Sequence, residues 1–210
     1  MGVAVGVVPL EGRGDLPLAD LHGEPMFLHS VRALVGTPGI GRVVVTAAAD
    51  HPRTVERMVA HARLHVDVVD PVTWWLEAHV HPRLVLADPL CPLLPSDYVA
   101  RVLAQAHLDT AVAGYRPVTD TVKTVVDQQI AGTLDRDSLA VVVSPVVLPG
   151  HLVRAETPPT HDFALLAAWL RKRGPVELVK APSMARRVGD ESALRVLECL
   201  DELGRRVHEA

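Results

Sequence analysis

Short valine-rich runs recur along the chain, and segments with helical periodicity separate them. The runs lie at residues 3–10, 42–46, 83–87, 110–114 and 139–148. Continuous apolar runs of this length are typical of strands that are buried on both faces of a parallel sheet. The helical segments between them are placed to cover those faces. We therefore expect an α/β fold with a mostly parallel sheet flanked by helices.

Composition limits how the core of such a fold can be built. The chain has 210 residues, of which 49% are hydrophobic but only 3% aromatic. This length is sufficient for one domain with a substantial core, and that core must consist largely of Val, Leu and Ala. We expect residues 1–210 to form a single domain. The paired Trp74 and Trp75 are expected in core or dimer packing, with base stacking as the alternative.

Charge and hydropathy exclude several classes of partner. The formal net charge is -4 and the sequence pI is near 6.2, so no basic footprint indicates nucleic acid or an anionic membrane. No apolar run approaches the roughly twenty residues of a membrane span, and no basic region precedes the first apolar run. We expect a cytoplasmic protein. Cys91 and Cys199 form no metal-type pair and are expected to be free thiols.

Several local signals predict helix boundaries and turns. Helices are expected at 25–35, 52–64, 95–107 and 163–172, with a further helix after Asp190. Asp70 and Ser96 have side chains suited to N-caps. In the last helix Leu194, Leu197, Leu200, Leu203 and Val207 are expected to face inward. Residues 121–139 are predicted to form a two-stranded excursion that turns near 131–132.

A glycine-containing loop follows the first predicted strand at once. Gly12 and Gly14 flank Arg13 there, and glycine lets backbone N–H groups approach phosphate closely. This order is typical of nucleotide-binding α/β domains. An ordinary tight turn remains the alternative, because the G-x-G-x-x-G fingerprint is absent.

One aspartate and one pair of histidines are candidate metal ligands. Asp88 follows the predicted strand at 83–87, where a magnesium-bound triphosphate would be held, and it could equally cap its own loop. His61 and His65 are spaced four apart, a spacing that could hold a metal on a helix face, but no third ligand accompanies them, so we expect two solvated histidines.

A second cluster of polar residues follows the apolar run at 110–114. Asp120, Thr121 and Lys123 come first, and Arg136 lies on the returning segment. Arg presents a fork that matches phosphate oxygens, Lys supplies a point charge, and Thr adds a neutral hydrogen bond. These residues are suited to a phosphorylated small molecule, although side chains at strand ends are also often simply solvated.

Two segments carry a resemblance to a known family. Residues 117–123 resemble the Pro-Val-x-Asp-Thr-x-Lys segment of the 2-C-methyl-D-erythritol 4-phosphate cytidylyltransferases, and residues 133–139 resemble their Thr-x-x-Arg-x-x-Leu segment. The resemblance implies a Rossmann-like nucleotidyltransferase fold with a protruding β-arm at about 121–139, through which two subunits pair as a homodimer. The implied activity joins CTP to 2-C-methyl-D-erythritol 4-phosphate with release of pyrophosphate, a step in isoprenoid precursor synthesis.

The resemblance also assigns roles to single residues. It implies catalytic roles for Lys123, Arg136 and Arg187, and a metal role for Asp88. The remaining site positions are Asp120, Thr121, Ser144 and Thr160 for the substrate, and Pro9, Gly12, Arg13 and Gly14 for the nucleotide. Three cations of the family pattern are missing, at Leu16, Leu18 and Cys91, all on the nucleotide side. Arg13 could replace one of them, whereas Glu11 would repel a triphosphate unless a metal intervened.

This pattern leaves two functional hypotheses. The first is a cytidylyltransferase, diverged from the family pattern, that uses Mg²⁺ near Asp88. The second is a catalytically inactive homologue that acts as a dimeric phosphate-ligand-binding or regulatory protein. The fold alone cannot choose between them, because function depends on the site.

Overall fold

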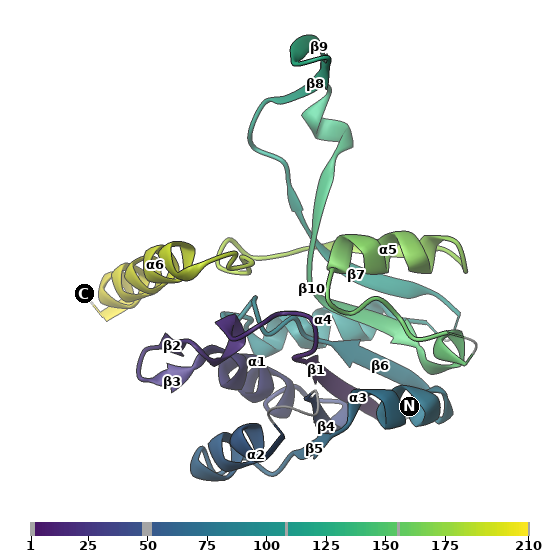
Figure 1. Cartoon of the computed structure of the whole chain (residues 1–210), viewed down its shortest axis with the longest axis vertical. Coiled ribbons are helices and arrows are strands. Elements are labelled where there is room, and N and C mark those ends of the chain that lie inside the picture. The colour runs from purple at the N-terminus through teal and green to yellow at the C-terminus, as the bar shows by residue number, and fades with distance from the viewer. Residues whose placement is uncertain (1–2, 48–51, 108, 155, 210) are drawn as a thin grey trace.

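The fold is built on one large sheet with helices on both faces (Figure 1). The structure is a computed structural model, and it describes residues 3–47, 52–107, 109–154 and 156–209, with the side chains of 206–209 excepted. The sheet has seven strands in the order β11-β7-β10-β6-β1-β4-β5. Their bounds are β1 Ala4–Pro9, β4 Ile40–Thr46, β5 Asp67–Val69, β6 Arg83–Leu86, β7 Ala111–Pro117, β10 Ala140–Pro149 and β11 Val176–Lys180.

Most strand pairs in this sheet are parallel, as the valine-rich runs predict. Strand β1 pairs in parallel with β4 and β6, β4 with β5, and β7 with β11. Only β10 is antiparallel to both of its neighbours, β6 and β7. Its pairing with β7 shifts register between Val143 and Val146. The expectation of a mostly parallel, Rossmann-like sheet is confirmed.

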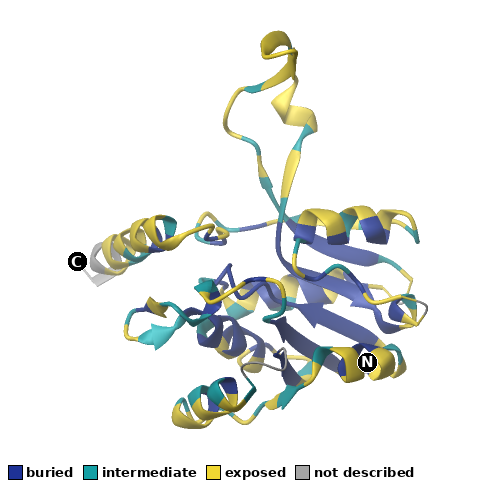
Figure 2. Cartoon of the chain, viewed as in Figure 1, coloured by how far each residue is buried: buried dark blue, intermediate teal, exposed yellow. Residues whose placement is uncertain are grey.

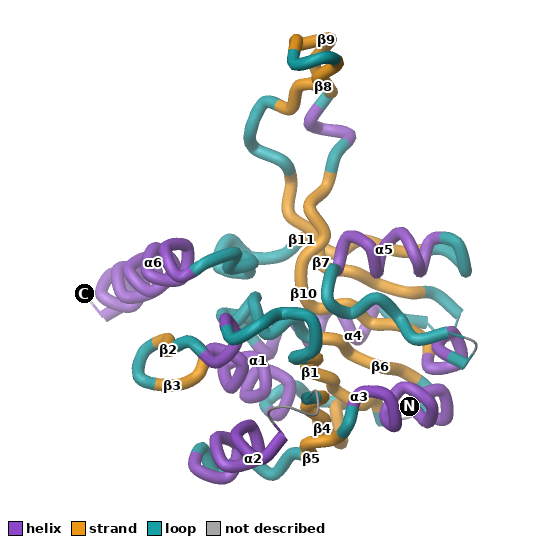
Figure 3. The backbone as a smooth tube through the Cα atoms, in the orientation of Figure 1, coloured by secondary structure: helices purple, strands orange, loops and turns teal. Residues whose placement is uncertain are grey.

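Helices and the sheet bury two apolar layers, one on each face (Figures 2 and 3). The described helices are α1 Met26–Val35, α2 Pro52–His61, α3 Pro71–Glu77, α4 Ser96–Gln105, α5 Phe163–Arg171 and α6 Glu191–Glu209. One layer contains side chains of α1, α2 and α4, such as Phe27, Val59 and Val102. The other contains side chains of α3 and α5. Trp74 and Trp75 are buried in this second layer, which confirms their core assignment.

A third apolar cluster attaches the start of α6 to a small hairpin. The hairpin consists of β2 (Asp20–Leu21) and β3 (Glu24–Pro25), and Leu21 packs with Leu194 and Leu197 of α6. The prediction for the rest of this helix is wrong, because Leu200 is 38% and Leu203 57% exposed. The later part of α6 extends beyond the body in Figure 1. The side chain of Val207 lies outside the described residues.

Of the two predicted N-caps, one is confirmed and the other is wrong. Asp70 caps α3 by accepting from Thr73 N at 3.0 Å, as predicted. At α4 the N-cap is Pro95, without a side-chain cap. The Ser96 hydroxyl donates to Ala33 O of α1 at 3.0 Å, so this serine ties two helices together and does not cap one.

The arm, which we define as residues 120–139, contains β8 (Val122–Val126) and β9 (Gln129–Leu134) and projects from the sheet at the top of Figure 1. Its turn is at Asp127 and Gln128, with φ of 48° and 63°, and not at 131–132. Positive φ at both central residues is the geometry of a type I′ hairpin turn, which follows the twist of the strands. Gly132 lies instead inside β9, where an added Cβ would be 3.1 Å from Thr124 Oγ1.

Candidate active site at the ends of β1 and β6

The loop after β1 needs its two glycines for conformational reasons. Gly12 has φ of 74° and Gly14 has φ of 58°, a region in which L side chains are strained. A Cβ at Gly12 would also lie only 2.9 Å from His161 Cβ. The loop follows Pro9, the last residue of β1, and a cavity of about 150 Å³ opens beside it, lined in part by Leu10, Gly12 and Gly14.

Glu11 anchors this loop to three other parts of the chain. Its carboxylate accepts from Thr46 Oγ1 at 2.6 Å, Thr160 Oγ1 at 3.2 Å and Trp75 Nε1 at 3.4 Å. Hydrogen bonds to the ionised form of a carboxylate stabilise its charge. Sequence reasoning treated Glu11 only as a group that repels phosphate and missed this role. Thr46 could have indicated this role. Thr46 ends β4, the parallel neighbour of β1, and parallel neighbours end at the same edge of a sheet, so its hydroxyl lies near the loop that follows β1.

Arg13 and Arg187 both donate to the carboxylate of Asp88. Arg13 Nε lies 2.9 Å from Oδ1, and Arg187 Nε lies 3.1 Å from Oδ2. The side chains of Arg13 and Asp88 are 1% and 3% exposed, whereas that of Arg187 is 46% exposed. One arginine is therefore sealed in the interior, and the other carries the cluster's positive charge to the surface.

Each of the three guanidinium nitrogens of Arg13 makes a hydrogen bond within the chain. In addition to Asp88, the guanidinium donates to the backbone carbonyls of Glu11 and Thr160. Its buried position suits a residue that holds the glycine loop against Asp88 and Thr160. Because its side chain is only 1% exposed, Arg13 would have to leave this position to replace a missing phosphate-binding cation, as the sequence suggested.

Ser144 and Thr160 join the same group of residues. The backbone N–H of Asp88 donates to Ser144 Oγ at 3.0 Å, and Ser144 sits in β10 at its register shift. Ser30 Oγ donates to the carbonyl of Asp88 at 3.3 Å. We call Glu11, Arg13, Asp88, Ser144, Thr160 and Arg187 together the Asp88 cluster.

The proposed metal position is occupied by cationic partners from the chain itself. Besides the two arginines, Asp88 Oδ1 accepts from Leu90 N at 3.1 Å, so Asp88 does cap its loop. The described residues contain no group of three or more His, Cys, Asp or Glu side chains that could hold a metal ion. Mg²⁺ is commonly held by one or two carboxylates together with substrate phosphates. For Asp88 to be the single protein ligand of such a site, Mg²⁺ would have to share its carboxylate with Arg13 and Arg187 or displace one of them.

The polar residues of the arm do not reach this cluster in their own chain. Lys123 Nζ donates to Thr133 Oγ1 at 2.6 Å, and Arg136 donates to Thr119 O at 2.8 Å. Asp120 and Thr121 are exposed on the segment that leads into β8. The structure therefore separates the predicted site residues into the Asp88 cluster and the arm.

The positions that lack the family's cations have apolar packing roles. Leu16 packs against the cluster formed around α6, and Leu18 against the layer of α1, α2 and α4. Cys91 is buried and, like the exposed Cys199, is a free thiol. Burial raises the pKa of the Cys91 thiol, and the Asp88 carboxylate raises it further. This thiol therefore stays protonated and supplies no charge to a phosphate.

Comparisons with known proteins agree on one family. The sequence profile of 2-C-methyl-D-erythritol 4-phosphate cytidylyltransferase matches residues 15–173. The enzyme of that name from Bordetella parapertussis is 32% identical over 173 residues, which cover 71% of this chain and 75% of the relative. The one from Streptomyces coelicolor is 28% identical, and the match covers 93% of this chain and 80% of the relative.

Solved structures give the same fold. The 4-diphosphocytidyl-2C-methyl-D-erythritol synthase from Anaerococcus prevotii superposes with a TM-score of 0.77 at 14% identity, covering 96% of each chain. The cytidylyltransferase from Thermus thermophilus gives a TM-score of 0.71 at 20% identity, covering 96% of this chain and all of that one. Among the described residues, no helix is long and apolar enough to cross a bilayer. The profile match spans most of the chain, and the chain belongs to the 2-C-methyl-D-erythritol 4-phosphate cytidylyltransferase family.

Proposed function

We propose that this chain catalyses transfer of the cytidylyl group of CTP to 2-C-methyl-D-erythritol 4-phosphate. In the reaction, a phosphate oxygen of the sugar alcohol attacks the α-phosphorus of CTP. The bond from that phosphorus to the bridging oxygen breaks, and pyrophosphate leaves with the electron pair. Membership of the family and the glycine loop at the end of β1 both support this assignment.

The observation that carries the proposal is the state of Arg187. Its Nε is fixed by Asp88, while its terminal nitrogens make no hydrogen bond to any described residue. A guanidinium that is oriented by a buried carboxylate and open to solvent is prepared to bind a phosphate. Preorganised donors of this kind stabilise charge that develops in the transition state. We assign Arg187 to the reacting phosphates and Asp88 to the orientation of Arg187.

The other residues of the cluster position the loop that would contact the nucleotide. Pro9, Gly12 and Gly14 set the path of the backbone, and Glu11 with Arg13 fixes it to the sheet. Bound Mg²⁺ would neutralise negative charge on the triphosphate, and Asp88 is the residue that would hold it. Ser144 and Thr160 are assigned to the side of the sugar phosphate, and both are buried within the Asp88 cluster.

We assign the arm to the contact with a second subunit. Its exposed apolar residues include Val125 at 62%, Val126 at 60% and Ile130 at 72%, and an isolated two-stranded hairpin is marginally stable in water. A homodimer would cover these side chains. It would also carry Asp120, Thr121, Lys123 and Arg136 to a partner's Asp88 cluster, since they lie away from their own.

Binding experiments with a matched pair of variants test the proposal. Calorimetric titration of the purified protein should show binding of CTP with Mg²⁺ and, separately, of 2-C-methyl-D-erythritol 4-phosphate. Arg187→Ala should weaken sugar-phosphate binding by about tenfold or more, because it removes a charged phosphate donor. Arg186→Ala is the control, since Arg186 is exposed and its Nε donates to Ser183 O. Equal affinity of the two variants would contradict the assignment of Arg187.

One set of observations favours a second candidate function. Leu16, Leu18 and Cys91 replace three cations of the family pattern, and Arg13 is fully engaged within the chain. A dimeric protein that binds a phosphorylated ligand without turnover is consistent with these facts. Binding of the sugar phosphate without binding of CTP, in a folded dimer, would favour this second candidate.

A further inference from the structure

Arg116 is a cation to which the sequence and the family resemblance give no role. It precedes Pro117 at the end of β7, and it is partly buried. Its guanidinium makes no hydrogen bond and no ion pair with the part of the chain that the structure describes. Burying a charge without a counter-ion costs stability. A cation in this state is suited to an anionic ligand.

The side chain of Arg116 lies on the face of the sheet that α4 covers. Strand β7 pairs with β11 without a register shift, so alternate residues of β7 point to the same face. An added Cβ at Gly114 would lie 2.5 Å from Tyr98 Oη of α4, so Gly114 faces that helix. Arg116 follows Gly114 by two residues and shares its face. Cys91 packs in the same layer as Tyr98.

Backbone hydrogen bonds connect this end of β7 to the Asp88 cluster. Tyr115 O accepts from Ala181 N at 2.8 Å, and the segment that begins at Ala181 leads to Arg187, whose Nε donates to Asp88. On the other side of the cluster, Cys91 N donates to Asp88 O at 2.9 Å. The segment that carries Arg187 therefore starts beside Arg116 and ends at the cluster.

Electrostatic effects agree with this placement. Burial lowers the pKa of the Arg116 guanidinium, and repulsion from Arg186 lowers it further. Burial and the Asp88 carboxylate raise the pKa of the Cys91 thiol, and the charges of Arg116 and Arg187 both oppose that rise. Arg116 and Arg187 are thus both within electrostatic range of Cys91. Arg116 adds positive charge there that no described carboxylate pairs with.

We propose that Arg116 is a further phosphate-binding residue of the site around the Asp88 cluster. Its guanidinium presents a fork that matches phosphate oxygens, and a bound phosphate would supply the counter-ion that it lacks. The ligand chemistry is a phosphate group, which the triphosphate of CTP and the sugar phosphate both offer. This inference rests on the proposed function. It would restore a cation near Cys91, one of the positions where the family pattern has lost one.

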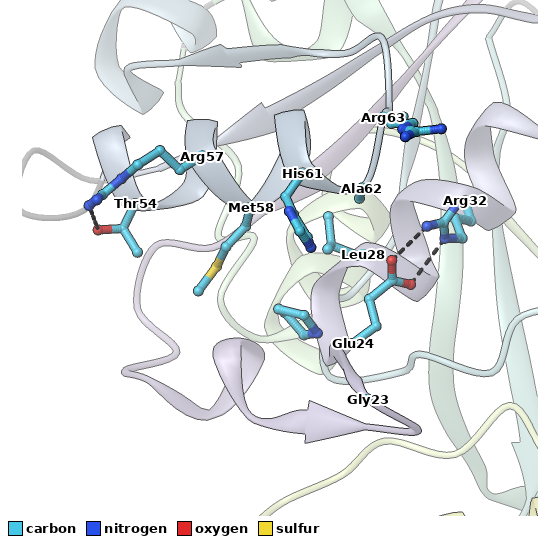
Figure 4. Close-up of a pocket in the computed structure, with 11 residues that line it drawn as sticks. Gly23, Glu24, Leu28, Arg32, Thr54, Arg57, Met58, His61, Ala62 and Arg63 are labelled. Carbon is cyan, nitrogen blue, oxygen red and sulfur yellow. Dashed lines mark hydrogen bonds and ion pairs between the residues drawn. The ribbon is translucent and has the colours of Figure 1, made fainter.

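Two arginines elsewhere in the molecule provide a contrast. Arg57 and Arg63 line a cavity of about 760 Å³ between the β2–β3 hairpin, α1 and α2 (Figure 4). Their guanidinium groups point toward opposite ends of α2, and Arg57 donates to Arg53 O at 3.1 Å within its own helix. These two side chains do not gather around one ligand position. Arg57→Gln is therefore a charge-matched control for Arg116→Gln.

Calorimetric titration of the wild type and both variants tests the inference. The ligands are CTP with Mg²⁺, 2-C-methyl-D-erythritol 4-phosphate, and inorganic pyrophosphate with Mg²⁺. Arg116→Gln should weaken binding of at least one of them by about tenfold or more, and the weakened ligand shows which phosphate Arg116 contacts. Arg57→Gln should stay within about twofold of the wild type for all three. Equal affinities of the two variants would overturn the inference.

The pyrophosphate titration separates this inference from the proposed function. If the wild type binds neither substrate but binds pyrophosphate in a manner that Arg116→Gln weakens, the phosphate site stands and the proposed function fails. If the wild type binds both substrates and Arg116→Gln binds all three ligands equally well, only this inference fails. No binding of any ligand by the folded wild type would overturn both.

Stability distinguishes a binding role from a structural one. Because Arg116 is partly buried and unpaired, the ligand-free Arg116→Gln should melt at the same temperature as the wild type or higher. The rise in Tm that saturating ligand produces should be smaller in this variant. Arg116→Lys should recover part of the affinity, because it keeps the charge but loses the fork. A lower Tm of ligand-free Arg116→Gln, together with no recovery in Arg116→Lys, would show a structural role and overturn the inference.

Discussion

The Asp88 cluster and the arm carry similar cations in opposite environments. In the cluster, Arg13 is buried and every one of its interactions is made within the chain. In the arm, Lys123 and Arg136 are exposed, and each makes one short-range hydrogen bond. The buried charges of the first region are paired with groups of the same chain. The exposed charges of the second region remain available to a partner surface. We therefore propose that the chain completes only part of a phosphate site by itself.

The largest expected effect comes from removing the carboxylate that pairs two arginines. Asp88→Ala should destabilise the protein by about 3–5 kcal/mol, because Arg13 would become an unpaired buried charge. Urea denaturation monitored by circular dichroism measures this loss. Asp135→Ala in the arm is the control, since Asp135 is exposed and accepts only local hydrogen bonds. Its cost should be about 1 kcal/mol or less, and a similar cost for both variants would remove the distinction between the regions.

The second prediction tests whether the arm serves a partner's cluster. The double variant Lys123→Ala/Arg136→Ala should lose most turnover without losing stability, because both side chains are exposed. Arg187→Ala should also lose turnover. Mixed dimers of the two variants should each contain one complete site, so an exchanged equal mixture should recover about a quarter of wild-type activity. No recovery after confirmed subunit exchange would show that arm and cluster act within one chain.

A smaller effect is expected from a single apolar residue of the arm. Ile130→Asp places a charge where we propose that a partner packs, and it should weaken dimerisation by about tenfold or more. Analytical ultracentrifugation over a concentration series measures the change. Val72→Asp, on the exposed face of α3, is the control because Val72 is 70% exposed and lies outside the arm. An unchanged dimer in Ile130→Asp would exclude the arm as the interface.

The smallest predicted effect concerns a surface ion pair outside both regions. The hydrogen bonds from Arg32 lower the pKa of Glu24 from its ordinary value of 4.5. A lowered folded pKa gives stability that is present above pH 4.5 and is lost as pH falls through the folded value. Arg32 is 48% exposed, so the contribution should be about 1 kcal/mol or less. Glu24→Gln should remove this part of the acid dependence, and an unchanged pH profile of the unfolding free energy would contradict it.

Much of the fold could be predicted from local sequence. The valine-rich runs became sheet strands because continuous apolar runs suit strands buried on both faces. Gly12 and Gly14 were placed in a loop, and both adopt positive φ. Asp70 caps its helix. Each of these features depends on residues that are close together in the sequence.

The failures have two different causes. Ser96 was expected to cap α4, but its hydroxyl donates to the carbonyl of Ala33, a distant residue in α1. Gly132 was expected to mark the arm's turn, but it sits opposite Thr124 where the pairing shifts register. Glycine inside a strand often marks such an irregularity. The turn formed at Asp127 and Gln128, of which Asp is common in type I′ turns and Gln is not.

The candidate site shows the same limit. The sequence identified Arg13, Asp88, Ser144, Thr160 and Arg187 as separate candidates, and the structure brings them together. The sequence did not reveal that Arg13 is buried against Asp88 or that Glu11 anchors the loop. Both facts depend on strand order, which places the ends of β1, β4 and β6 side by side. Spacing along the chain carries no information about that order.

Release of pyrophosphate reports on the proposed cytidylyl transfer directly. Purified protein would be mixed with CTP, Mg²⁺ and 2-C-methyl-D-erythritol 4-phosphate, with Arg187→Ala and Arg186→Ala assayed in parallel. We expect turnover by the wild type and by Arg186→Ala, and a loss of about a hundredfold or more in Arg187→Ala, the scale of a preorganised transition-state donor. Absence of turnover by a folded, dimeric wild type would contradict the proposed activity.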